Sequence, residues 1–164
     1  MSDETNTPDK YPLIAKGAEL PARIGSGYPS PLDEPCATRA KTTLGDVVGL
    51  SQFGVNLLVL QPGCWSAQRH WHQNEDEFIY VLEGEVSLVT DEGESLVRVG
   101  EFAGFPAGQP NGHHLVNKGS EPVKVLEVGT RAENDTASYP DVDLKAVTKG
   151  GKYWFLHKSD EPYE

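Results

Sequence analysis

Short apolar runs with a β-forming composition recur through the middle of the chain. They are rich in Val, Ile, Leu, Phe and Tyr, and none is longer than an ordinary strand. The runs occupy residues 55–60, 77–82, 85–90, 95–99, 113–117 and 123–129. Turn-forming segments such as "QPG", "DEGE" and "NKGSEP" separate them, and nothing in this region sustains the 3.6-residue apolar period of a helix. The pattern predicts an all-β barrel or sandwich.

The two ends of the chain differ from the middle in amino-acid composition and pattern. Residues 1–41 begin with a polar segment and continue into a proline-rich stretch, which predicts a disordered tail followed by an extended arm. We expect the barrel core within residues 42–135 and a C-terminal extension that packs on it within residues 136–164. In that extension, "YPDVDLKAV" is compatible with a short helical turn and "KYWFLHK" with a closing strand.

Chain length and net charge indicate how many domains to expect and which kinds of partner to exclude. The 164 residues fit one domain, and 14 Lys and Arg against 25 Asp and Glu give a formal net charge of −11. Because this charge repels phosphate backbones and anionic lipid, we expect no nucleic-acid or membrane partner. The acidic N-terminus lacks the features of a secretory signal, which predicts a cytoplasmic protein in which Cys36 and Cys64 are free thiols.

The segment "RHWHQNEDEFIYVLEG" contains two of the five histidines. In a strand, His70 and His72 lie on one face about 7 Å apart, a spacing that lets two imidazoles bind one metal ion. A nearby carboxylate would complete such a site, and Glu75, Asp76 and Glu77 are all candidates. Strict alternation favours Asp76, whereas a turn or bulge in "QNEDE" would reset the phase and favour Glu77.

A second segment, "GEFAGFPAGQPNGHHLVN", has a glycine- and proline-rich turn that leads directly into a short strand. His113 and Asn117 are four residues apart and therefore lie on one face of that strand, whereas His114 points to the other face. The segment thus offers a third imidazole.

Together the two segments resemble the paired motifs of the cupin superfamily. The first motif matches Gly63, His70, His72, Glu77 and Gly84, and the second matches Gly100, Pro106, Gly108, His113 and Asn117. Two spacers differ from the family pattern: Gly63 to His70 is one residue longer and Gly108 to His113 is two residues longer. The second difference raises His114 as an alternative, but only His113 keeps the three-residue interval to Asn117.

The resemblance implies a fold and a site. The fold is a double-stranded β-helix, the cupin-type jelly-roll barrel, preceded here by the extended N-terminal arm. The implied metal ligands are His70, His72, Glu77 and His113, with Glu77 as the catalytic residue. They would hold one divalent ion (Zn, Mn, Fe or Ni) and leave coordination positions open to a small-molecule substrate.

The resemblance leaves the reaction open, because cupins catalyse many reactions. We expect isomerase-like proton transfer on a sugar, a sugar phosphate or a related hydroxy-carbonyl substrate, since no aromatic cluster is evident on the ligand face. A phosphate would need inward-facing cations, for which Arg39, Lys41 and Arg69 are the candidates. An iron-dependent dioxygenase and a non-enzymatic sensor are the alternatives.

Other residues have expected positions relative to this site. Ser66 and Gln68 share the face of His70 and are candidates for lining the pocket, if they are not ordinary polar strand residues. Phe78 and Tyr80 should point away from it, where an apolar outer face and the family resemblance favour a homodimer.

Overall fold

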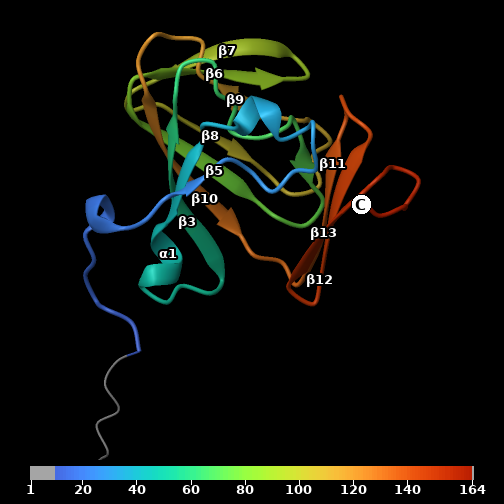
Figure 1. The fold of residues 1–164 in the computed structure, drawn as a ribbon, viewed down its shortest axis with the longest axis horizontal. Helices are drawn as coiled ribbons and strands as arrows, with labels where there is room; N and C mark the ends of the chain where they lie inside the picture. Colours follow the sequence, from blue (N-terminus) through green and yellow to red (C-terminus); the bar gives the residue numbers. More distant parts are fainter. Residues whose placement is uncertain (1–9, 164) are drawn as a thin grey trace, which may run out of the picture.

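The computed structural model describes residues 10–163, so most of the predicted tail lies outside the described residues. Three antiparallel sheets and three short helical segments make up the fold (Figure 1). The helical segments are η1 (Gly17–Glu19), η2 (Glu34–Cys36) and α1 (Leu44–Val47). The all-β prediction is confirmed.

The largest sheet contains six strands in the order β1-β2-β3-β10-β5-β8. In that order their bounds are Arg23–Ile24, Ala40–Thr43, Phe53–Leu60, Val123–Thr130, Glu77–Glu83 and Phe102–Phe105. Strand β1 and the first half of β2 come from the predicted arm, which therefore extends the main sheet. Strand β8 lies inside a segment that the glycine and proline content had assigned to a turn, so that part of the turn prediction was wrong.

Two smaller sheets complete the structure. One has the order β7-β6-β9, with bounds Gly93–Arg98, Glu85–Thr90 and His114–Val116. The other has the order β13-β12-β11-β4, with bounds Lys152–Leu156, Leu144–Lys149, Asn134–Tyr139 and Trp71–His72. In Figure 1 the C-terminal strands form a separate layer beside the barrel. In "YPDVDLKAV", residues 140–143 form a turn without becoming a helix, and strand β12 follows from Leu144. The segment "KYWFLHK" forms strand β13, as expected.

The core follows from strand alternation. In β5, Ile79 and Val81 are buried, whereas Phe78 and Tyr80 face outward and are more than a third exposed. The inward residues of β3, β5, β6 and β10 pack into one apolar cluster around Leu58 and Val125. At the turn from β5 to β6, Gly84 has φ +78°, and a Cβ there would lie 3.1 Å from the Val123 side chain.

The N-terminal arm is fixed to the body by specific hydrogen bonds. The Gln68 side-chain amide donates to the carbonyl of Leu32 at 2.7 Å, and the Trp65 N–H donates to that of Pro35 at 2.9 Å. Cys36 and Cys64 are buried free thiols, as expected. Within residues 10–163, no helix has the length and apolar character needed to cross a bilayer.

Candidate metal centre

Four residues predicted from the sequence meet inside the barrel, and we call them the histidine–glutamate cluster: His70, His72, Glu77 and His113. His72 lies in β4 and Glu77 begins β5. His70 and His113 form an isolated β-bridge, in which the His70 N–H donates to the His113 carbonyl at 3.1 Å and the His113 N–H donates back at 2.8 Å. The segments that resemble the two cupin motifs are thus joined through their backbones at the site.

The carboxylate of Glu77 lies at the centre of the cluster. Its Oε2 is 2.7 Å from His113 Nε2 and 3.7 Å from His70 Nε2, and its Oε1 is 3.7 Å from His72 Nε2. Asp76, the alternative from strict alternation, instead accepts a hydrogen bond from the Ala107 N–H at 2.8 Å. A bend at residues 73–74 separates β4 from β5 and resets the phase, so that Glu77 is the carboxylate that faces the histidines.

Hydrogen bonds at Nδ1 fix two of the imidazole rings. His70 Nδ1 donates to the Gln68 carbonyl at 2.7 Å, and His72 Nδ1 donates to Asp135 Oδ2 at 2.6 Å. In each neutral ring this leaves the Nε2 lone pair directed toward Glu77. Asp135, in β11, also accepts the Asn74 N–H at 2.8 Å, so its carboxylate is held from two sides. A carboxylate behind a histidine is a common support for metal-binding imidazoles.

The choice between His113 and His114 has a clear structural answer. His113 faces Glu77, and the ring of Phe105 stacks parallel to it with centroids 3.6 Å apart. Its Nδ1 is buried without a hydrogen-bond partner among the described residues, so stacking orients this ring. His114 points to the other face, where its Nδ1 donates to the Ala67 carbonyl at 2.9 Å and its ring contacts Trp65.

Burial and the neighbouring groups shift the pKa values of the cluster residues in opposite directions. Burial alone would raise the pKa of Glu77, but the hydrogen bond from His113 and the nearby His70 and His72 bring that pKa well below its usual value. Burial would lower the pKa of His72, but Asp135 and Glu77 raise it overall. For His113 burial prevails and the pKa is lowered. Glu77 is therefore an anion at neutral pH, as a metal ligand must be.

The cluster fits a divalent first-row ion. Ligand atoms about 2.1 Å from a metal lie roughly 3 to 3.4 Å apart, and the three distances around Glu77 are close to that spacing. Three imidazole nitrogens and one carboxylate suit Zn, Mn, Fe or Ni. Among the described residues, two groups of possible ligands lie close together: His70, Glu77 and His113, and His72, Glu75 and Asp135. In the second group His72 Nδ1 already donates to Asp135, so we assign Asp135 a supporting role.

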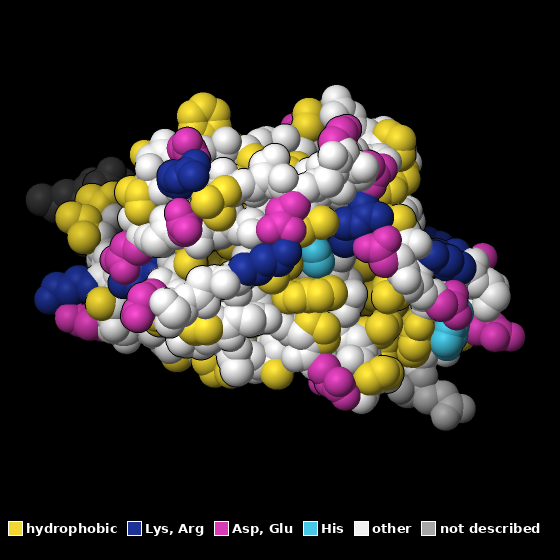
Figure 2. Space-filling view, turned by 90° about the horizontal axis from the view of Figure 1, so that it is seen from above, with side chains coloured by type: hydrophobic (Ala, Val, Ile, Leu, Met, Phe, Trp, Pro, Cys, Tyr) yellow, Lys and Arg dark blue, Asp and Glu magenta, His cyan; other side chains and the backbone are white. Residues whose placement is uncertain are grey.

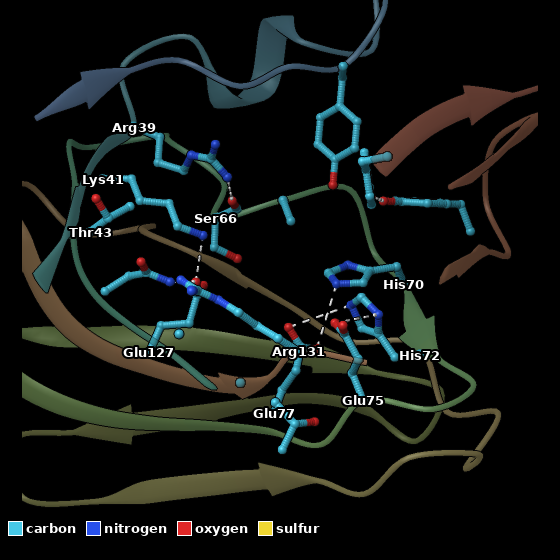
Figure 3. A pocket seen from close by; sticks show the side chains of 18 residues that line it. Arg39, Lys41, Thr43, Ser66, His70, His72, Glu75, Glu77, Glu127 and Arg131 are labelled. Atoms are coloured by element: carbon cyan, nitrogen blue, oxygen red, sulfur yellow. Dashed lines mark hydrogen bonds and ion pairs between the residues drawn. The ribbon is translucent and has the colours of Figure 1, made fainter. Parts of the chain in front are cut away.

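A cavity of about 390 Å³ opens onto the cluster. Figure 3 shows Arg39 and Lys41 on one side of it, with His70 and His72 on the other. Its wall also contains Ser66, Thr43, Asn56, Glu75 and Glu127. In Figure 2, basic and acidic side chains gather around a histidine on one face of the molecule. A cavity of this size and polarity suits a small hydrophilic molecule.

The sequence-based candidates around the site divide into two groups. Ser66, Arg39 and Lys41 line the cavity as expected. Arg69 does not: it binds both carboxylate oxygens of Asp141 at 2.7 Å and also contacts Asp91. Gln68 holds the N-terminal arm instead of lining the cavity.

Several residues of the site were not identified from the sequence. Tyr28, Tyr139 and Tyr153 line the cavity, so the expectation of no aromatic cluster was wrong. The Tyr139 ring stacks on His70 with centroids 5.4 Å apart. These tyrosines and Asp135 come from the arm and the C-terminal strands, which contain neither motif. Asp135 had a weak signal, since an acidic residue inside a strand is uncommon.

Comparison with known proteins agrees with this architecture. The family model described as "Cupin domain" matches residues 56–129. A protein from Silicibacter pomeroyi, described as a sugar phosphate isomerase from a cupin superfamily, is 44% identical with a TM-score of 0.85, over 90% of this chain and 94% of that one. A protein from Acidithiobacillus ferrooxidans, described as a candidate sugar phosphate isomerase, is 30% identical with a TM-score of 0.70, over 78% of this chain and 81% of that one.

More distant structures share the fold alone. The polyketide cyclase RemF from Streptomyces resistomycificus is 23% identical with a TM-score of 0.58, over 71% of this chain and 78% of that one. No curated protein matches the chain significantly. The motif residues, the barrel and the two more similar structures lead to the same assignment: the chain belongs to the cupin superfamily.

Proposed function

We propose that this protein is a metal-dependent isomerase that moves a proton within a sugar, a sugar phosphate or a related hydroxy-carbonyl substrate. The observation that carries the proposal is the polar cavity of about 390 Å³ bordered by the histidine–glutamate cluster. The two similar structures described as sugar phosphate isomerases support the same reaction class.

The cluster has the composition of a catalytic metal site. A divalent ion held there would polarise a substrate carbonyl and so acidify the neighbouring C–H bond. The residues themselves hold the geometry: Gln68 and Asp135 orient two of the imidazoles through Nδ1, and Phe105 orients His113 by stacking. Hydroxyl and amide groups of Thr43, Asn56 and Ser66 are placed to orient substrate hydroxyls.

Proton transfer needs a base besides the proposed ligand Glu77, and among the described residues two other carboxylates line the cavity, those of Glu75 and Glu127. Both Lys41 and Asn56 donate to Glu127 Oε1, at 2.7 and 3.0 Å. Glu75 accepts one hydrogen bond, from the Ala132 N–H to Oε1 at 2.9 Å, and its Oε2 lies 3.6 Å from His72 Nδ1. Because Glu75 has the less constrained carboxylate on the cluster side of the cavity, we assign it as the base.

Deuterium exchange tests this reaction directly. Metal-loaded protein is incubated in D₂O with a panel of tetrose, pentose and hexose phosphates and with the parent sugars. NMR then follows deuterium incorporation at the carbon next to the carbonyl. We expect exchange with at least one substrate, slowed about 100-fold by Glu75→Gln with metal content unchanged. Glu127→Gln is the matched carboxylate control and should retain more activity.

Two results would contradict the isomerase. Oxygen uptake with Fe(II) and substrate, without deuterium exchange, would indicate the dioxygenase. Ligand binding without turnover, unchanged by Glu77→Gln, would indicate the sensor.

A further inference from the structure

A second cavity, of about 370 Å³, adjoins the one above the histidine–glutamate cluster. The two cavities share Tyr28, Arg39, Lys41 and Tyr153 in their walls. The second cavity extends away from the cluster toward Arg23 and Ser26, beneath the N-terminal arm. The two cavities therefore border one another at these four residues.

The charge of this second cavity is opposite to that of the whole protein. Arg23, Arg39 and Lys41 line it, and no Asp or Glu of residues 10–163 does, although the chain carries a formal net charge of −11. Arg23 lies directly opposite Lys41 across strands β1 and β2. Like charges in such a pair repel one another, and Glu127 compensates only the charge of Lys41.

Arg39 has no carboxylate partner among the described residues. Its Nε and Nη2 donate to the Gly25 carbonyl at 3.2 and 2.9 Å, and its Nη1 donates to the Ser66 carbonyl at 2.7 Å. These contacts fix the guanidinium but bring no negative charge. Lys41 differs, because Glu127 Oε1 lies 2.7 Å from its Nζ. The positive potential of the cavity therefore depends mainly on the two arginines.

Ser26 also lines this cavity. Its Oγ has no hydrogen-bond partner among the described residues but is closed off from solvent, so a ligand would reach it only after the side chain rotates. The neighbouring Gly27 also matters, because a Cβ there would lie 3.0 Å from Arg23 Nη2. Glycine lets the arginine lie close to the backbone at this point.

We propose that this cationic cavity binds the phosphate group of a phosphorylated substrate while the carbonyl end faces the histidine–glutamate cluster. Phosphate fits better than a carboxylate, because its several acceptor oxygens can meet two guanidinium groups and a hydroxyl at once. The position of the carbonyl end rests on the proposed isomerase function. The phosphate site does not depend on it.

Binding of inorganic phosphate to metal-free protein tests the site, because a chelated sample has no metal that could take the anion. Isothermal titration calorimetry at constant ionic strength compares wild type with Arg23→Ala and Lys41→Gln. Each variant should weaken phosphate binding about 10-fold. Arg98→Ala removes an exposed arginine outside both cavities and should bind like wild type. Arg39 is left intact because its hydrogen bonds hold the arm.

The same experiment can overturn the proposal. Absence of phosphate binding by the wild type, or equal binding by Arg23→Ala and Arg98→Ala, would exclude this site. Acetate binding as tight as phosphate binding would show a general anion site and contradict the assignment to phosphate.

Comparing the affinities for a sugar phosphate and its parent sugar tests whether the phosphate site binds the substrate. It also separates the proposed phosphate site from the proposed isomerase function. A sugar phosphate should bind the metal-loaded protein at least 10-fold more tightly than its parent sugar, and Arg23→Ala should abolish that difference. This result would stand even if no deuterium exchange were found. Equal affinity for sugar and sugar phosphate would contradict the phosphate site whatever the reaction is.

Discussion

At the scale of single residues, the site depends on the groups that hydrogen-bond to the imidazole Nδ1 atoms as much as on the Nε2 atoms that face Glu77. Asp135 and the Gln68 carbonyl decide which nitrogen of His72 and His70 keeps its lone pair. Such contacts raise metal affinity because the rings need no reorientation when the ion binds. Asp135 is only 5% exposed and is shared between His72 and the Asn74 N–H, which makes it the strongest of these supports.

We predict that Asp135→Asn lowers metal affinity 10- to 100-fold, because the amide holds His72 less firmly than the carboxylate does. Competition with a chromophoric chelator measures the change. Asp143→Asn is the control, since Asp143 also contacts a histidine Nδ1, that of His157 at 2.8 Å, but outside the cluster. Equal affinities in the two variants would show that Asp135 does not support the site.

At the scale of elements, the site is built where short strands meet. Strand β4 has two residues, pairs with β11, and has few backbone hydrogen bonds of its own. Arg69 compensates for this: it binds Asp141 bidentately and donates to the Gly112 carbonyl at 3.2 Å. It thus connects the segment that carries His70 and His72 to the β11–β12 loop and to the segment before His113.

We predict that Asp141→Asn destabilises the protein by about 0.5 to 1 kcal/mol at pH 7, a modest value because Asp141 is partly exposed. Hydrogen bonds from Arg69 hold the pKa of Asp141 below its usual value of 3.8. A lowered folded-state pKa adds stability above the unfolded-state pKa, and that stability is lost as the pH falls through the folded-state pKa.

Urea denaturation across a pH series measures this dependence. The difference between wild type and Asp141→Asn should be constant above about pH 5, should shrink as the pH falls below about 3.9, and should disappear below the folded-state pKa of Asp141. A difference in the free energy of unfolding that persists where Asp141 is protonated in both states would mean that the Arg69–Asp141 ion pair is not its cause.

The positions of the motif residues could be predicted from the sequence more readily than those of the other residues of the site. His70, Glu77 and His113 lie in segments where spacing and alternation act locally, so their positions followed from the pattern. The tyrosines of the cavity and Asp135 reach the site through the pairing of distant strands. No local pattern encodes that pairing. Strands β2 and β8 have four residues each, too few for an alternation to be recognised.

At the scale of the whole molecule, one outer face of the barrel is apolar although it is exposed to solvent. Phe78, Tyr80 and Leu82 of β5 point outward next to Phe102 of β8, which is 67% exposed. Phe78 and Phe102 stack with centroids 5.7 Å apart. An outer sheet face in contact with water is normally polar, and a contiguous apolar patch favours association.

We predict a homodimer that buries this face. Analytical ultracentrifugation should give twice the chain mass for wild type and a shift toward monomer for Phe102→Glu. Trp154→Glu, at an exposed aromatic residue of β13, should leave the dimer intact. A monomeric wild type would contradict the prediction.

Two adjacent histidines, only one of which faces Glu77, allow metal binding at the histidine–glutamate cluster to be tested. Chelated wild type, His113→Asn and His114→Asn are reloaded with Mn²⁺ or Zn²⁺, dialysed and measured by plasma mass spectrometry, with circular dichroism to verify folding. We expect one ion per chain in wild type and in His114→Asn, and loss of most of the metal in folded His113→Asn. Metal retained by His113→Asn but lost by His114→Asn, or no metal in the wild type, would contradict metal binding at the cluster.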